Sequence, residues 1–301
     1  MKYLKTIIKI PVMLILTVLL ILIIDYIRLN IFYIMNKDNY IEVADTQGNK
    51  NKYAPQGLTY SKKYNVILET AYNKNDVSKL FVIDFETGNL LKELELIEID
   101  DKENHNHVGG IATNDETVWI TNDYEVNEYN LEEIMTTENR FIKSKKNNKL
   151  INRGDFCTYK DNTLWIGHFY LKPFYDAPND TPLLYGYDTN NLDYTNPKYT
   201  IILPKMVQGM AITDENNFIF TRSYTNLINS KLTIYKDMTK ENHVIIKEQS
   251  LPPMAEGIFY KDKELYILFE NNSDKYFFAY PKVKKIIKIS VWNWYFFICN
   301  S

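Results

Sequence analysis

Hydrophobic residues recur along this chain in short runs that do not alternate with polar residues. Five of these runs are three residues long, and a polar residue follows each run closely. A run that is apolar on both of its alternating faces predicts a strand that is covered on both sides. The five runs occupy residues 66–68, 118–120, 164–166, 218–220 and 266–268.

A second motif precedes each run and predicts a partner strand. It begins at residues 56, 109, 154, 208 and 256, as in Gln56-Gly57-Leu58 and Glu256-Gly257-Ile258. Turn-forming residues separate the two strands, so each pair is expected to form a hairpin. Successive copies begin 53, 45, 54 and 48 residues apart, a spacing typical of four-stranded propeller blades. The sequence therefore predicts an all-β fold, a five-bladed β-propeller over residues 54–301.

The hairpin geometry predicts where a functional site would lie. The first strand leaves one end of the blade and the second returns to it, so their polar ends lie together at the mouth of the central channel. A convergence of polar groups in a concavity is the default hypothesis for a binding site, the alternative being that these groups only solvate the channel. The predicted ring comprises Gln56, Thr70, His107, Asn122, Asp155, His168, Gln208, Arg222, Glu256 and Glu270.

Five ring residues are candidates for acid–base catalysis. Glycoside cleavage needs one protonated and one ionised carboxyl group, which any two of Asp155, Glu256 and Glu270 would supply. His107 and His168 are candidates because histidine titrates near neutral pH. The inert alternative is that the glutamates form ion pairs with Arg222 or Arg153 across the channel.

Other ring residues are candidates for ligand binding. Arg222 is the best anchor for an anion, because a guanidinium group binds a carboxylate, sulfate or phosphate through two hydrogen bonds. Tyr170 and Tyr224 lie two residues beyond ring positions, where an aromatic ring either stacks on a sugar or packs inside the protein. The amide side chains expected to bind the ligand are Gln56, Asn122 and Gln208.

Composition restricts the cofactors and partners. The formal net charge of -3 and the isoelectric point near 5.9 give no indication of nucleic-acid binding. The cofactor is unknown from the sequence. Calcium fits the oxygen ligands of the ring, and zinc is less favoured. Cys157 is expected to be a small buried side chain, and its pairing with Cys299, the second of two cysteines, is left open.

The N-terminal residues predict a membrane anchor. Lys2, Lys5 and Lys9 precede an uncharged stretch over residues 10–24, which ends without the small residues of a cleavage site. We therefore favour an uncleaved signal anchor over a cleaved signal or a helix lying on the inner surface. Basic residues stay in the cytoplasm, which predicts a single-pass cell-membrane protein with its propeller on the extracytoplasmic side.

The predicted organisation is an anchor helix with flanks over residues 1–36, a linker over 37–53 and the propeller over 54–301. The linker is also a candidate for the outer strand of the last blade, which would close the ring. The apolar tail, which includes residues 286–289 and 291–298, is expected to form a closing outer strand.

Several short strings resemble a known group of proteins. They are HVGGIA at 107–112, VQGMA at 207–211, PPMAEG at 252–257 and LFE at 268–270, with Lys275-Tyr276 close behind. These strings resemble uncharacterised secreted or membrane-anchored bacterial propeller-like proteins over residues 55–280. Glycine after Gln or Glu on the inner strand is more distantly similar to gluconolactonase-like and phytase-like propellers. That resemblance implies metal-assisted hydrolysis, although the full set of acidic ligands of those families is not recognisable here.

The sequence thus favours an anchored propeller that binds a small polar or anionic ligand at its channel mouth, such as a cell-envelope glycan. A glycan-directed hydrolase or lyase that uses the ring carboxylates and histidines is the first alternative. The second alternative is a protein-interaction platform, for which the candidate surfaces are the outer faces of the propeller and the lysine-rich insertion over residues 131–149.

Overall fold

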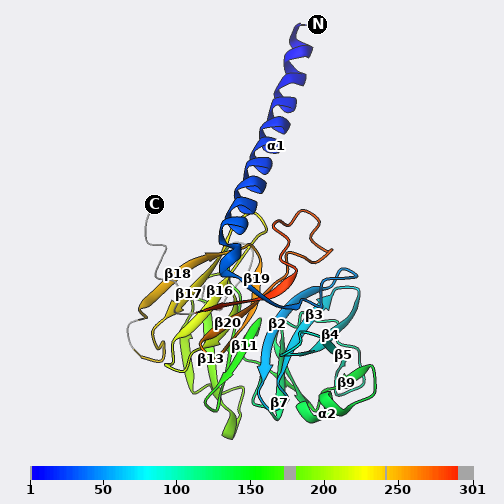
Figure 1. Cartoon of the computed structure of the whole chain (residues 1–301), viewed down its shortest axis with the longest axis vertical. Coiled ribbons are helices and arrows are strands. Elements are labelled where there is room, and N and C mark those ends of the chain that lie inside the picture. Colours follow the sequence, from blue (N-terminus) through cyan, green and yellow to red (C-terminus); the bar gives the residue numbers. More distant parts are fainter. Residues whose placement is uncertain (1, 173–180, 241–242, 291–301) are drawn as a thin grey trace.

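A long helix projects from a ring of five sheets in the computed structural model (Figure 1), which describes residues 2–172, 181–240 and 243–290. The helix, α1, covers Lys2–Asn36 and is followed by a 3-10 turn at Lys37–Asn39. Within this region, Pro11–Asn39 is long and apolar enough to cross a membrane. A signal sequence near the N-terminus also meets this criterion of length and composition. The chain thus joins a hydrophobic helix to a β-propeller.

Each of the five sheets contains one propeller blade of four antiparallel strands, as the sequence predicted, and the sheet of the first blade carries a fifth strand in addition. The first strands of neighbouring blades contact one another in a closed ring around the axis. The blades comprise β2 (Ala54–Ser61), β3 (Val66–Asn73), β4 (Asp76–Asp84) and β5 (Leu90–Ile97); β6 (Gly110–Thr113), β7 (Thr117–Asn122), β8 (Glu125–Asn130) and β10 (Lys146–Lys149); β11 (Phe156–Lys160), β12 (Thr163–Gly167), β13 (Leu183–Asp188) and β14 (Tyr199–Ile202); β15 (Val207–Ile212), β16 (Phe218–Arg222), β17 (Ser230–Tyr235) and β18 (Ile245–Leu251); and β19 (Ala255–Lys261), β20 (Glu264–Phe269), β21 (Lys285–Ser290) and β1 (Ile41–Asp45).

The second strand of a blade is covered on both faces, which accounts for its unbroken apolar run. On β3, Ile67 packs into the cluster shared with the fifth blade, whereas Leu68 packs into the cluster shared with the second blade. Both side chains are fully buried. Alternate residues of one strand therefore contribute to two different inter-blade cores.

The recurring glycines reflect how closely the inner strands pass. A Cβ atom on Gly209 would lie 2.4 Å from the carbonyl oxygen of Glu256 on the next blade. Threonine hydroxyl groups also link neighbouring blades. Thr221 donates to the same Glu256 carbonyl oxygen at 2.7 Å, and Thr70 donates to the carbonyl oxygen of Val108, at the start of the second blade, at 2.8 Å. Thr70, predicted at the channel mouth, is thus a buried link between two blades.

The ring is closed by β1, which pairs antiparallel with β21 and is the outer strand of the fifth blade. The segment 37–53 therefore supplies the outer strand as well as the connection from α1. Residues 286–289 belong to β21, the third strand of that blade, so the expectation that they form the outer strand was wrong. Residues 291–301, including Cys299, lie outside the described residues, and so does any pairing of Cys299 with the buried Cys157.

The insertion over residues 131–149 is part of the propeller body. It contains α2 (Leu131–Thr136), β9 (Phe141–Lys143) and β10. β9 pairs in parallel with β5, and β10 is the outer strand of the second blade. Much of the segment is thereby used to extend two neighbouring sheets.

A buried glutamate on β3 predicts that stability depends on pH. Glu69 accepts hydrogen bonds from the backbone N–H groups of Gly48, at 2.7 Å, and Gln47, at 3.1 Å. Burial raises its pKa to about 7 despite these bonds. The native state thus binds a proton more tightly than the unfolded chain, and this contribution to stability is full below about pH 4.5 and is lost as the pH rises through 7.

We expect Glu69→Gln to remove this pH dependence. The wild type should lose on the order of 3 kcal/mol of unfolding free energy between about pH 4.5 and pH 7 through this group. Urea unfolding of both proteins at a series of pH values measures the effect. Equal slopes in the two proteins would show that Glu69 is not the titrating group.

Candidate functional site

The loops at one end of the propeller enclose a cavity of about 820 Å³ at the mouth of the central channel. All five blades contribute to its wall. Seven residues predicted from the sequence line it: Gln56, His107, Asp155, Gln208, Tyr224, Glu256 and Glu270. The remaining wall includes Tyr72, Arg153, Lys275, Tyr276, Phe277 and Phe278.

Local strand irregularities turn polar side chains into this cavity. The register of the first two strands shifts between Pro55 and Leu58 in the first blade and between Ala255 and Ile258 in the fifth. A similar shift between Val207 and Gly209 occurs in the fourth blade. Such a bulge changes the direction in which a side chain points. The polar residue before each glycine can therefore point into the cavity instead of following the alternating pattern of the strand.

A pair of carboxyl groups, Glu256 and Glu270, lines the cavity. The Glu256 and Glu270 carboxyl groups are close enough to share a hydrogen bond once one of them is protonated. The side chain of Gln208 donates to Oε1 of Glu256 at 3.1 Å, and that of Gln56 donates to Oε2 of Glu270 at 3.2 Å. The Tyr276 hydroxyl also donates to Oε2 of Glu270, at 2.8 Å. Two carboxyl groups and two carboxamides therefore form one network.

The environment of the pair places a proton on Glu256. Burial raises the pKa of both carboxyl groups, and the charge of Glu270 raises that of Glu256 further. The Tyr276 hydroxyl and the Lys275 ammonium group act in the opposite direction on Glu270 and favour its ionised form. We therefore describe the pair as one proton shared by two carboxyl groups, with Glu256 as the donor and Glu270 as the acceptor.

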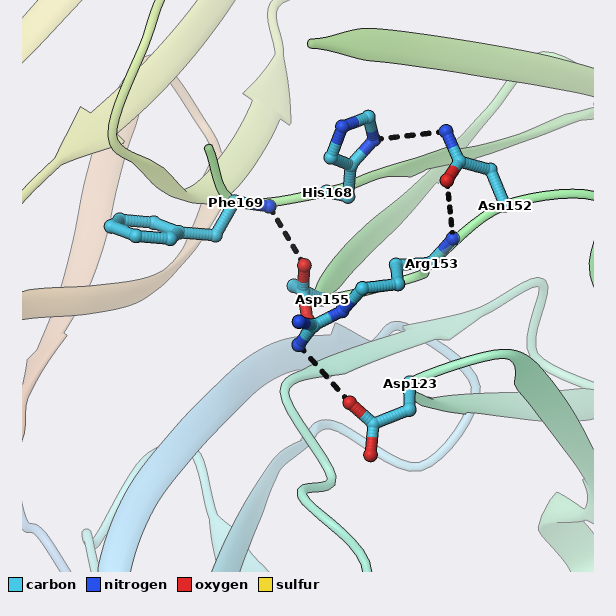
Figure 2. Close-up of polar contacts among 6 residues, drawn as sticks. All are labelled: Asp123, Asn152, Arg153, Asp155, His168 and Phe169. Atoms are coloured by element: carbon cyan, nitrogen blue, oxygen red, sulfur yellow. Dashed lines mark hydrogen bonds and ion pairs between the residues drawn. The ribbon is translucent and has the colours of Figure 1, made fainter. Parts of the chain in front are cut away.

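A second cluster of polar residues centres on Asp155, which lines the cavity together with Arg153 and Phe169 (Figure 2). Nη2 of Arg153 lies 2.7 Å from Oδ1 of Asp155 and 3.1 Å from Oδ1 of Asp123. The backbone N–H of Phe169 donates to the other Asp155 oxygen at 2.8 Å. Asp155 is thereby held by a cation and an amide, which favours a structural or positioning role over a free nucleophile.

The two candidate histidines have lowered pKa values because both are shielded from solvent. His107 packs edge-on against Tyr72, with ring centroids 4.5 Å apart, and burial lowers its pKa to about 4. Burial also lowers the pKa of His168 to about 4, and its Nδ1 lies 3.3 Å from the Asn152 amide nitrogen. Both rings are therefore neutral near pH 7. His107 lines the cavity, whereas His168 is buried and is not part of its wall.

Three predicted ligand-binding residues lie elsewhere. The Arg222 guanidinium forms an ion pair with Glu248 at 3.2 Å and donates to the backbone carbonyl of Lys205. Asn122 is buried, and within the described part of the chain its side-chain amide has no hydrogen-bond partner. The Tyr170 ring is buried and is not part of the cavity wall.

Lys275 and its neighbours also belong to the site, although the repeat in the sequence does not predict them there. The Lys275 ammonium group donates to the Tyr72 hydroxyl at 2.6 Å and lies 4.3 Å from the centre of that ring. Tyr276 follows it and contacts Glu270. The sequence does contain a signal for Lys275 and Tyr276. Both follow the ring position Glu270 on the connection between β20 and β21, which lies at the mouth of the cavity.

No group of three or more His, Cys, Asp or Glu side chains is placed to hold a metal ion among the residues that the structure describes. The calcium or zinc ion considered from the sequence stays an untested prediction. The groups present in the cavity can donate and accept hydrogen bonds and can transfer a proton between Glu256 and a bound molecule.

Comparisons with known proteins agree on the fold. No protein-family model matches the sequence, and no curated protein matches it either. A glutaminyl cyclase from Myxococcus xanthus has a similar structure, with a TM-score of 0.52 and 7% identity over 83% of this chain and 94% of that one. An aldose sugar dehydrogenase from Streptomyces coelicolor, solved with bound PQQ, has a TM-score of 0.50 and 12% identity over 83% and 96% of the two chains. At these identities the likeness establishes the propeller fold alone.

Proposed function

We propose that this protein is a membrane-anchored, extracytoplasmic propeller that binds a small polar ligand, a glycan in particular, in its mouth cavity. The observation that carries the proposal is the pair of interacting carboxyl groups, Glu256 and Glu270, in the wall of that cavity. Gln56 and Gln208 complete the network by donating to the two carboxyl groups. A site built of such groups suits a ligand that offers several hydroxyl groups.

Aromatic residues favour a sugar among polar ligands. Tyr72, Tyr224 and Tyr276 line the same cavity as the carboxyl pair. Sugar rings present C–H faces that pack on aromatic rings while their hydroxyl groups bind acids and amides. The Arg153 guanidinium group in the cavity wall is not free to bind an anionic ligand, because it already binds two aspartates. We therefore narrow the ligand from polar or anionic to hydroxyl-rich.

Helix α1 supports the proposed membrane anchor and its orientation. Its residues 11–24 have exposed apolar side chains, which in water would be unfavourable and in a bilayer would be matched to lipid. Lys2, Lys5 and Lys9 precede this stretch, and the propeller follows it. The positive-inside rule then assigns the propeller to the extracytoplasmic side.

An acid–base enzyme is the second candidate, favoured by a protonated Glu256 beside an ionised Glu270. Two neighbours by fold are themselves enzymes by name, a glutaminyl cyclase and a sugar dehydrogenase. Glycoside hydrolysis by this pair fits less well, because its carboxyl groups should stand about 5 Å or more apart across the bond. Here the two carboxyl groups are close enough to share a hydrogen bond. Binding is therefore the function that the geometry supports best.

A matched pair of glutamine variants tests the proposal. Calorimetric titration of the detergent-solubilised full chain with methyl glycosides and disaccharides would identify a binding sugar. We expect Gln208→Ala to weaken that sugar by about tenfold, because it removes a hydrogen bond to a buried carboxyl group. Gln249→Ala is the control, since Gln249 lies on the outer strand β18 and outside the cavity. Absence of binding by any sugar, or equal effects of the two variants, would contradict the proposal.

A further inference from the structure

Four large apolar side chains are exposed on two loops beside the cavity. Leu227 and Ile228, on the loop between β16 and β17, are 39% and 61% exposed. Phe277 and Phe278, on the loop between β20 and β21, are 74% and 77% exposed. We call these four residues the apolar rim. A cluster of this kind at the edge of a polar cavity marks an interaction surface.

The apolar rim lies against α1 where the helix leaves the propeller. Nη2 of Arg28 donates to the backbone carbonyl of Leu227 at 2.9 Å, and Tyr26 packs edge-on against Tyr280 with ring centroids 4.8 Å apart. The side chain of Leu29 is 2% exposed. In Figure 1 both loops reach alongside α1, and the helix continues beyond them away from the sheets. The cavity mouth and the helix therefore face the same side of the molecule.

A groove of about 370 Å³ separates the helix from these loops. Leu22, Tyr26 and Leu29 form its helical wall, and Leu227, Phe278 and Tyr280 form the opposite wall. Asn226 and Phe278 line both this groove and the polar cavity. The polar cavity and the apolar groove are therefore adjacent and share part of one wall, an arrangement that suits a molecule with a polar head and a hydrocarbon chain.

The length of the apolar stretch fixes the level of the bilayer. Residues 10–24 rise only about 22 Å along a helix, less than the ~30 Å of a hydrocarbon core. The boundary must then extend past Ile24 toward Arg28, whose ion pair with Asp25 has a length of 3.2 Å. Tyr26 and Arg28 contact the two loops, so the apolar rim is at the same level. Leu22, within the apolar stretch, brings the groove into the hydrocarbon.

We infer that the apolar rim lies in the outer leaflet and that the cavity takes the sugar headgroup of a glycolipid, whose acyl chain occupies the groove. This inference rests on the proposed function and specifies where the sugar comes from. The bilayer is the occupant of the rim because α1, which would be embedded in it, is continuous with the rim through Arg28 and Tyr26. A sugar is favoured over a phosphate headgroup because the ionised Glu270 would repel an anion.

Site-specific photocrosslinking tests the inference. The full chain is reconstituted in phosphatidylglycerol vesicles that contain diglucosyl diacylglycerol, and benzoylphenylalanine replaces Phe278 at the groove or Tyr224 in the cavity. We expect lipid adducts at residue 278 and glycolipid adducts at residue 224, identified by mass spectrometry. Val244, 51% exposed in the connection between β17 and β18, is the matched control and should give no lipid adduct. With the crosslinker at residue 224, Leu227→Ala should reduce the glycolipid adduct roughly tenfold by removing apolar groove surface.

The outcomes separate this inference from the proposed function. Binding of a free disaccharide without lipid adducts at residue 278 would overturn the inference and leave the proposed function standing. Phosphatidylglycerol adducts in place of glycolipid adducts at residue 224 would overturn the sugar headgroup. Absence of both sugar binding and glycolipid adducts would remove the proposed function itself.

Discussion

Replacing Glu270 by glutamine is expected to weaken ligand binding by roughly 100-fold, whereas Glu256→Gln should change it by less than about threefold. Glu270 is the ionised acceptor of the pair and receives hydrogen bonds from Gln56 and Tyr276. A glutamine offers only one acceptor oxygen and presents an NH₂ group to the proton of Glu256. At position 256, by contrast, glutamine reproduces the protonated acid, because it can still accept from Gln208 and donate to Glu270.

The two variants can be compared by titration with the sugar that binds the wild type. Thermal unfolding serves as the folding control, and we expect Glu256→Gln to match the wild type near neutral pH. If the protein is an acid–base enzyme instead, Glu256→Gln should retain binding and lose turnover, because the amide has no proton to transfer. Equal losses of affinity in the two variants would contradict the assigned positions of proton and charge.

The pH dependence of the pair has a defined sign. The pKa of Glu256 is raised in the native state by burial and by Glu270, so stability from its proton is present below about pH 4.5 and is lost as the pH rises through the native pKa. Affinity should fall over the same rise, because a second negative charge would then face the ligand. Glu256→Gln carries no such proton and should not show the fall attributable to this group.

The repeat in the sequence predicted the fold and much of the cavity for a geometric reason. Strand ends of a hairpin must meet, so Gln56, Gln208, Glu256 and Glu270 could be placed together without knowledge of their rotamers. The glycine after three of these ring positions also has a physical basis, the close approach of inner strands. Both inferences depend on backbone periodicity, which a sequence shows directly.

Side-chain direction was the part that the repeat could not predict. Arg222 ends the second strand of its blade as expected, but its long side chain reaches Glu248 on the outer strand of the same blade. His168 similarly leaves the cavity and meets Asn152. Lys275 enters the site from a loop that no repeat describes, and its place beside Tyr72 depends on tertiary contacts.

Closure of the ring by β1 gives the largest expected effect on folding, which Ala44→Asp tests. Ala44 is 3% exposed and packs with Leu58, Ile67 and Phe259 between the fifth and first blades. An aspartate there would put an unpaired charge into an apolar cluster and separate β1 from β21. We expect a loss of about 3 to 5 kcal/mol of unfolding free energy, the cost of an uncompensated buried charge. Urea unfolding followed by circular dichroism measures it.

Ile41→Asp is the matched control, because it introduces the same charge on the same strand at a side chain that is 56% exposed. It should change the unfolding free energy by less than about 0.5 kcal/mol, as is usual at exposed positions. Proteolysis should likewise cleave the Ala44→Asp chain near residues 46–52 faster than the control. If the two variants unfold at the same urea concentration, β1 does not close the propeller, and the contacts of α1 must hold the fifth blade in the ring.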